Sequence, residues 1–182
     1  MADLSLMKGA AMDRLQPSDL LVVLELIALE NASASVRHVA SELDIPASTV
    51  GEAFRRLASA GILRPAEGEK GRAINKLALR DCIIHGVRWI APAKIGRVAR
   101  GVPTAHATPP ISNRVLSDQE ALVIACRNGA LRGRSVSPIH SKVPRACLRN
   151  ERMHQLVALV DVFRVGRARD REVATKELNQ WV

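Results

Sequence analysis

Residues 35–64 constrain the fold more than any other part of the chain, because their apolar side chains recur at the spacing of two short helices. In the first helix they occupy positions i, i+3, i+4 and i+7, which share one face. These positions are Val36, Val39, Ala40 and Leu43. Ile45 and Pro46 interrupt the pattern, and a second apolar face follows, formed by Val50, Ala53, Phe54 and Leu57. Gly61 ends this second helix, so the segment predicts two helices joined by a tight turn.

Both flanks of this helix pair carry signals of further elements. Upstream, residues 16–19 (QPSD) precede the apolar run LLVVLELIAL, which predicts a capped and largely buried helix. Downstream, Ile62-Leu63 begins an extended segment, and the polar residues 64–71 contain one proline and two glycines. Residues 72–74 then return as a second extended segment. Two short strands joined by a flexible basic tip are therefore expected after the helices.

This order of elements resembles the winged helix-turn-helix DNA-binding domain of bacterial regulators of the MarR-like and IclR-like families. The resemblance covers residues 17–75, about a third of the chain. It is carried by Val39-Ala40, Leu43, Ile45, residues 46–50 (PASTV), Arg55-Arg56-Leu57 and residues 60–63 (AGIL). It implies a sequence-specific, double-stranded DNA-binding transcriptional regulator. Asp44 departs from the glycine common in such turns, and Gly51-Glu52 stand where a polar and basic pair is common on the recognition helix.

The side chains expected at DNA lie on the outward face of the second helix and on the strand pair. The helix contributes Ala47, Ser48, Thr49, Gly51, Glu52, Arg55 and Arg56. Arg37 of the first helix is added, together with Lys70 and Arg72, which flank the glycine expected at the tip of the wing. Arg55 can donate to guanine O6 and N7, and Glu52 can accept from cytosine N4. The alternative is that the arginines touch only phosphates and that the basic tip is simply solvated.

The net charge of +9 lies entirely in the second half of the chain. Residues 1–91 carry 11 Lys/Arg and 11 Asp/Glu, whereas residues 92–182 carry 16 and 7. Three interpretations remain open: added phosphate contacts beside the operator, an acidic protein partner, or a basic surface without a specific target. Arg127, Arg132 and Arg134 are the candidates for added phosphate contacts, because a hairpin would present them as one cluster.

The second half also predicts several elements. Asn75 is expected to cap a helix that stops before Pro92, and the prolines of residues 92–115 predict an extended crossing segment, neither a long helix nor a central strand. Residues 121–125 and 131–136 are expected to form a hairpin around an Asn-Gly turn. Helices are expected from about Asn150 to Val165 and from Asp170 onward. Such an apolar pair serves most often as core and next most often as a dimer seam.

The fold class is therefore mainly α with small β. We expect an N-terminal lead at residues 1–14 that need not be ordered, a winged helix-turn-helix domain at 15–91 and a basic α+β region with terminal helices at 92–182.

Several functional classes are excluded by the remaining features. The sequence has no HExxH, P-loop or GxSxG pattern, so we expect neither an enzyme nor a metal or cofactor. Two Phe, two Trp and no Tyr are too few for a surface that stacks single-stranded bases. Three separated cysteines without a CxxC pair predict reduced thiols in the cytoplasm. The longest apolar run, residues 20–29, is too short to cross a bilayer, so no membrane partner is expected.

Together these features predict a dimeric, cytoplasmic DNA-binding repressor, because two recognition helices are needed to meet successive major grooves. Two other functions remain open. One is an antitoxin-type interaction protein that represses its own operon and binds an acidic partner. The other is a plasmid or phage replication or partition factor with the same DNA-binding unit.

Overall fold

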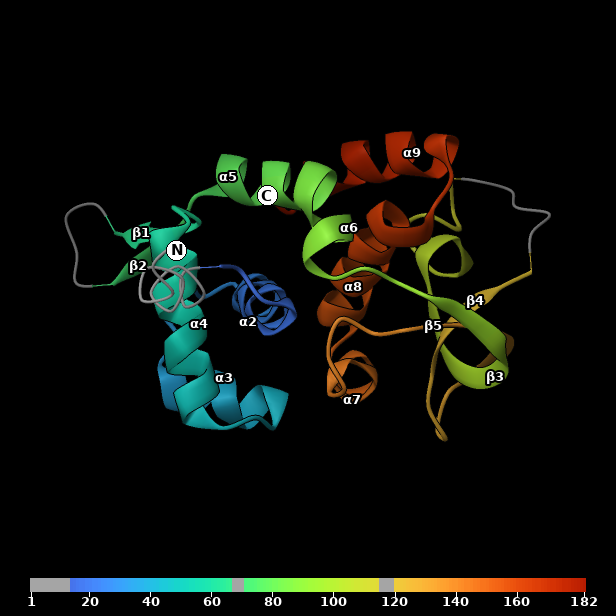
Figure 1. Cartoon of the computed structure of the whole chain (residues 1–182), viewed down its shortest axis with the longest axis horizontal. Helices are drawn as coiled ribbons and strands as arrows, with labels where there is room; N and C mark the ends of the chain where they lie inside the picture. The colour runs from blue at the N-terminus through green and yellow to red at the C-terminus, as the bar shows by residue number, and fades with distance from the viewer. Residues whose placement is uncertain (1–13, 67–70, 115–119) are drawn as a thin grey trace, which may run out of the picture.

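The computed structural model describes residues 14–66, 71–114 and 120–182, of which about half are helical (Figure 1). The first described elements are the helices α2 (Pro17–Ala28), α3 (Val36–Leu43) and α4 (Ala47–Ser59). They precede the antiparallel strands β1 (Leu63–Pro65) and β2 (Arg72–Ile74). A helical segment follows, made of α5 (Lys76–Asp81), a π-helical turn (Cys82–Gly86) and α6 (Val87–Ile90). Helices with small sheets match the predicted class, and no helix in the described ranges is long and apolar enough to cross a bilayer.

The first three helices begin and end where the sequence signals indicate. The Asp19 carboxylate accepts a hydrogen bond from the Gln16 backbone N–H at 2.8 Å, and Ser35 Oγ accepts from the His38 N–H at 3.1 Å. Both contacts satisfy amides that a helix start leaves without partners. The predicted inward faces of α3 and α4 are buried, except that Val36 is half-buried. Asp44 adopts the left-handed conformation, with φ 53° and ψ 48°, which Asp tolerates better than most residues.

Three further strands, β3 (Ile95–Thr104), β4 (Leu122–Ala125) and β5 (Leu131–Val136), close into a small barrel. β3 pairs antiparallel with both others, and Gly101 faces Ala125 on one side and Leu131 on the other. The barrel is too narrow to accept side chains at its closest points. A Cβ added to Gly133 would lie 2.2 Å from the Ala121 carbonyl oxygen, well inside van der Waals contact. Glycine is therefore required where the strands approach one another.

Two predictions for this region are wrong. Residues 92–115 do contain a central strand, because the ten residues of β3 pair with β5 up to Gly101 and with β4 from Gly101 onward. Pro103 is tolerated because it lies beyond the end of the β5 pairing and has only β4 beside it. β4 and β5 do not form a hairpin either. They follow one another along β3 and pair in parallel, with Leu122 facing Arg134.

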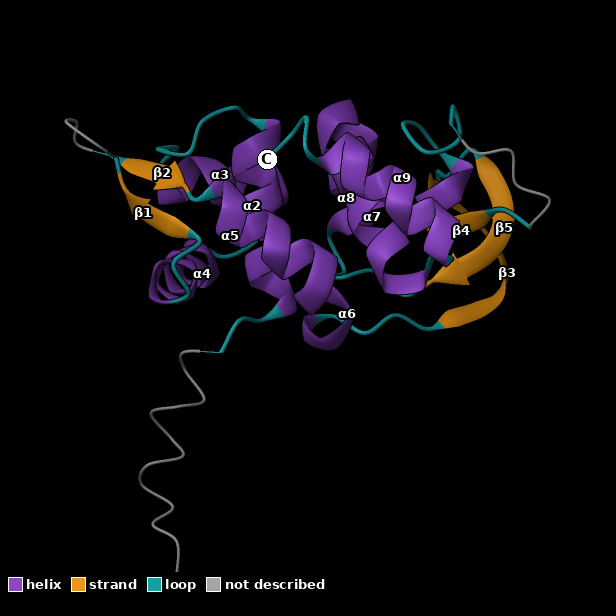
Figure 2. Ribbon diagram, turned by 90° about the horizontal axis from the view of Figure 1, so that it is seen from above, coloured by secondary structure: helices purple, strands orange, loops and turns teal. Residues whose placement is uncertain are grey.

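The remaining helices place α8 in the centre of the molecule. α7 (Val143–Arg149), α8 (Glu151–Val165) and α9 (Ala168–Leu178) follow the barrel, and α8 runs between the first helices and the strands (Figures 1 and 2). The Asn150 side chain caps α8 by accepting from the Arg152 N–H at 2.9 Å. Residues 156–164 of α8 are buried on all sides. The predicted helix from Asn150 to Val165 is confirmed, and its apolar surface is used within the protomer as core.

A buried guanidinium joins α8 to both halves of the chain. Arg164 donates through Nε to the Ala91 carbonyl at 2.7 Å and through Nη2 to the Ser137 carbonyl at 2.8 Å. Its Nη1 pairs with the Asp161 carboxylate one turn earlier in α8, and Asp161 also accepts from Thr104 Oγ1 at 2.7 Å. The side chains of the ion pair are each 1 % exposed. This network therefore links α6, the end of β3 and the segment after β5 to one helix.

Ion pairs on the surface join the two halves a second time. Lys142 and Arg145 lie 2.8 and 2.6 Å from the Asp44 carboxylate at the end of α3. Arg152 lies 2.7 Å from Glu30, and Arg149 lies 3.8 Å from Glu42. The hydrogen bond from Lys142 lowers the pKa of Asp44, and the charges of Lys142 and Arg145 lower it further. Part of the positive surplus of the second half is thus neutralised by acids of the first half.

We predict that Arg164→Met destabilises the protein by about 3–5 kcal/mol, because it leaves Asp161 buried without its countercharge. Adding Asp161→Asn to that variant should recover part of the loss, since it removes the unpaired charge. Urea unfolding followed by circular dichroism measures both effects. Arg169→Met, on the exposed side of α9, is the control and should change stability by less than about 0.5 kcal/mol. Equal losses for Arg164→Met and Arg169→Met would contradict the role of the network.

Candidate nucleic-acid interface

The exposed face of α4 is the first part of the candidate interface. Ala47, Ser48, Glu52, Arg55, Ala58 and Ser59 are exposed, and Thr49 and Gly51 are half-buried. Val50, Ala53, Phe54 and Leu57 anchor the opposite face in the core, so the helix cannot rotate without exposing them. Within the described residues, Arg55 has neither a hydrogen-bond nor an ion-pair partner. Its guanidinium is therefore available to a ligand, as is that of the exposed Arg37 on α3.

Arg56 does not belong to this exposed face, and the prediction that it points outward is wrong. Only 8 % of the residue is exposed, and its Nε and Nη2 donate to the two carboxylate oxygens of Asp19 at 2.9 and 2.8 Å. The hydrogen bond with Asp19 raises the pKa of Arg56 above its ordinary value, against the opposing effect of burial. Arg56 therefore ties α4 to the start of α2 and is a structural residue.

Glu52 and Gly51 shape the middle of the exposed face. One carboxylate oxygen of Glu52 lies 3.5 Å from Arg56 Nη1, and the side chain is 54 % exposed. The buried arginine thus restrains an acceptor that still faces solvent. Apart from the chain neighbours and the backbone of α4 itself, no described atom lies within 4 Å of the position that a Cβ on Gly51 would occupy. Packing within the described residues therefore does not require glycine here.

The strand pair beside α4 holds Arg72 in an inward position. The Arg72 guanidinium lies over the Phe54 ring at 4.1 Å, and its Nη2 donates to the Ala34 carbonyl at 2.6 Å. Burial lowers the pKa of Arg72. Arg72 therefore packs the strand pair against α4, and the prediction that its side chain projects from the tip is wrong. Lys70, the other basic residue predicted at the tip, lies outside the described residues.

A second cluster of arginines lies on the barrel. Arg132 and Arg134 on β5 face Arg100 and Val98 on β3, and all four are exposed. Arg127, which was expected in the same cluster, lies exposed in the turn after β4. Sequence reasoning missed Arg100 because residues 92–115 were not expected to form a paired strand. A period-two pattern is absent here even in the structure, because residues 95–100 are all exposed except the half-buried Ala99.

The two basic regions lie far apart in the molecule. α4 and the barrel stand at opposite ends of the long axis in Figure 1, with α8 between them. Seen from above, α4, α6 and β3 lie along the same side of the molecule (Figure 2).

Comparison with family models, with curated protein sequences and with solved structures finds no match to this chain. The resemblance to winged helix-turn-helix regulators thus stays a prediction from the residues. Function is inferred below from the geometry of this chain.

The neighbouring residues Arg55 and Arg56 give a matched test of this geometry. We predict that Arg56→Ala costs about 3–5 kcal/mol of stability, because it leaves the Asp19 carboxylate buried and unpaired. Arg55→Ala should change stability by less than about 0.5 kcal/mol, since its side chain is exposed. Thermal and urea unfolding of the two variants measure the difference. Similar stabilities would show that Arg56 is not the buried anchor of α4.

Proposed function

We propose that this protein is a cytoplasmic transcriptional regulator that binds double-stranded DNA in a sequence-specific way through α4. The observation that carries the proposal is the exposed face of α4, where the unpaired Arg55 and the restrained Glu52 project from a rigidly anchored helix. A guanidinium is a forked donor that matches the two acceptors of guanine, and a carboxylate can accept from cytosine. Rigid placement favours the discrimination of bases, because each side chain then meets the same base edge.

The order of elements supports the same proposal. Three helices followed by an antiparallel strand pair is the order of the winged helix-turn-helix, in which the third helix enters the major groove. Arg72 braces the strand pair against α4, which would hold both at a constant angle to the duplex. The small residues Ala47, Ser48 and Gly51 near the start of α4 allow its backbone to approach the bases closely.

The protein is proposed to act as a repressor and as a homodimer. Regulators of this type generally place two recognition helices in successive major grooves, one helical turn apart. A two-fold arrangement of this kind uses the same surface on both copies. Because α8 is buried in the core of the protomer, other surfaces have to form the proposed dimer interface. Blocking a promoter requires no further machinery, which favours repression.

The arginines of the barrel are proposed to contact phosphates that flank the site read by α4. Arg100, Arg132 and Arg134 form one exposed basic face, and phosphate contacts of this kind position a protein without reading sequence. A second candidate function is favoured by the apolar residues around them. Ile95, Val98 and Leu131 are 44, 51 and 38 % exposed. Arginines mixed with apolar side chains are typical of protein interfaces, so the barrel would then bind an acidic partner protein.

Arg55→Ala should weaken binding to the preferred DNA site by about 1–3 kcal/mol if Arg55 reads a base. On random DNA the loss of affinity should be smaller, because there Arg55 can contribute only a phosphate contact. Fluorescence anisotropy with both duplexes measures the ratio. Ser59→Ala, on the last turn of α4, is the control and should leave both affinities unchanged. An equal loss on both duplexes would show that Arg55 only positions the helix.

Gly51→Ala should have opposite effects on folding and on binding. The added methyl group enters open space and improves helix propensity, so stability should rise by about 0.5–1 kcal/mol. The same group separates the α4 backbone from the bases, so DNA affinity should fall. Unfolding curves and anisotropy on one protein preparation test both. Unchanged DNA affinity in a stabilised variant would remove Gly51 from the interface.

The double change Arg132→Gln and Arg134→Gln should reduce the slope of log affinity against log salt by about two units if both residues neutralise phosphates. Arg169→Gln with Lys176→Gln removes the same charge from α9 and should leave the slope nearly unchanged. DNA binding measured over a series of salt concentrations decides between the two functions of the barrel. Equal slopes for all three proteins would remove the basic face from the DNA interface and leave the acidic partner protein as the candidate function of the barrel.

A further inference from the structure

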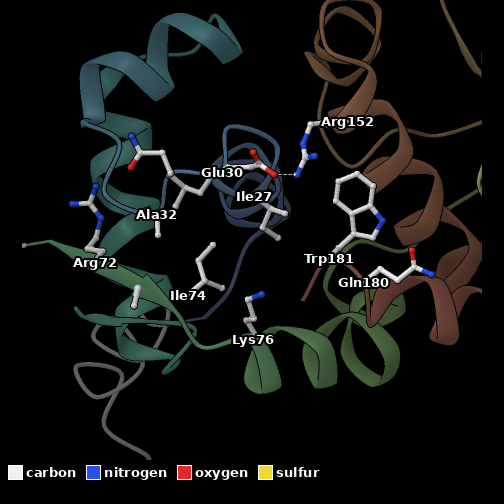
Figure 3. A pocket seen from close by; sticks show the side chains of 12 residues that line it. Ile27, Glu30, Ala32, Arg72, Ile74, Lys76, Arg152, Gln180 and Trp181 are labelled. Carbon is white, nitrogen blue, oxygen red and sulfur yellow. Dashed lines mark ion pairs between the residues drawn. The ribbon is translucent and has the colours of Figure 1, made fainter. Parts of the chain in front are cut away.

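A pocket of about 520 Å³ lies where the first helices, the strand pair and the end of the described chain meet. Its lining comes from the end of α2, from β2, from the first residue of α5, from the first turn of α8 and from the segment after α9. Figure 3 shows Trp181 on one side of the pocket and Ile74 with Ala32 on the other, with Ile27 between them. The volume lies within the range that holds small organic ligands in proteins, roughly 300–1,000 Å³.

The charged residues of the pocket are unequally divided between the two signs. Lys76 and Arg152 enter from opposite sides, and Glu30 is the single acidic residue in the lining (Figure 3). Arg152 lies 2.7 Å from the Glu30 carboxylate and 4.9 Å from the centroid of the Trp181 ring. Lys76 is exposed and has no ion-pair partner among the described residues. The Arg72 guanidinium points away from the pocket toward Phe54, so only the aliphatic part of the Arg72 side chain lines the pocket.

We propose that this pocket binds a small organic anion with a flat apolar body. Its carboxylate would contact Lys76, the lining cation without an ion-pair partner among the described residues, and its ring would pack against Trp181. Ile27, Ile74 and Trp181 offer apolar surface to the body of such a ligand, and a placed cation fixes its orientation.

The pocket shares its walls with the elements that present α4. Ala73 and Ile74 of β2 line it, and the neighbouring Arg72 lies over Phe54 of α4. A ligand that contacts β2 can therefore change how the strand pair packs against α4. This consequence rests on the proposed DNA-binding function, whereas binding of the anion does not. If both ligands bind, each changes the affinity of the other by the same factor.

Isothermal titration calorimetry of the full chain with 1-naphthoate tests the proposal, with the neutral 1-naphthamide as the comparison ligand. We expect 1-naphthoate to bind at one site and at least about fivefold more tightly than the amide, because only the acid gains charge-assisted hydrogen bonds. Lys76→Gln should weaken the binding of 1-naphthoate by a similar factor and leave the binding of the amide unchanged. Trp181→Leu should weaken the binding of both ligands, since both pack against the Trp181 ring.

Lys94→Gln removes one positive charge outside the pocket and is the matched control. The proposal is overturned if 1-naphthoate gives no saturable heat up to about 5 mM, if the amide binds equally well, or if Lys94→Gln and Lys76→Gln have the same effect. DNA binding with and without 1-naphthoate is measured separately. A chain that binds 1-naphthoate but no DNA would contradict the proposed regulatory function and leave the pocket assignment standing.

Discussion

The Arg164 guanidinium ties together segments that are far apart in the sequence and joins α6 and the barrel to the central helix α8. It meets the Ala91 carbonyl at the end of α6, the Ser137 carbonyl after β5 and the Asp161 carboxylate within α8. A charge buried to this degree is stable only when all its donors are used and a countercharge is present. The arrangement therefore fixes the positions of α6 and the barrel relative to α8. The surface ion pairs of Asp44 and Glu30 then orient the first helices against the second half of the chain.

Charge is used in three different ways along this chain. Arg56 and Arg164 are buried with Asp19 and Asp161, where they hold helices in place. Lys142, Arg145, Arg149 and Arg152 pair with acids of the first half at the surface. Such exposed pairs contribute little stability each, so they orient the halves more than they stabilise them. Among the charges left for ligands are those of Arg55 on α4 and of the barrel arginines, which is why the proposed contacts concentrate there.

Local pattern predicted the first three helices and their buried faces well, because helical period and capping act within a few residues. It placed Arg56 on the outward face because the position of Asp19 in α2 is not visible from α4 alone. The inward turn of Arg72 was missed for the same reason, since its partners Phe54 and Ala34 lie in other elements.

The barrel was predicted least well. Its strands pair between residues 12 to 41 positions apart, and β4 and β5 run parallel despite their short connection. The Asn-Gly turn signal predicts a reversal of the chain but not which strand becomes the partner. α7 is only seven residues long and was overlooked, although Pro144 in its first turn is typical of a helix start. The pocket combines residues from four stretches of the chain, residues 26–32, 72–76, 152 and 180–181, and no sequence pattern brings these together.

Recovery of DNA fragments bound by the full chain from a genomic pool, followed by affinity measurement on the recovered and shuffled sequences, tests the central claim most directly. The account predicts a recurring site with two-fold symmetry and half-sites about one helical turn apart. It also predicts binding to the recovered site about 10³-fold or more tighter than to its shuffled version at physiological salt. Recovery of unrelated fragments with equal affinities would contradict sequence-specific recognition by α4.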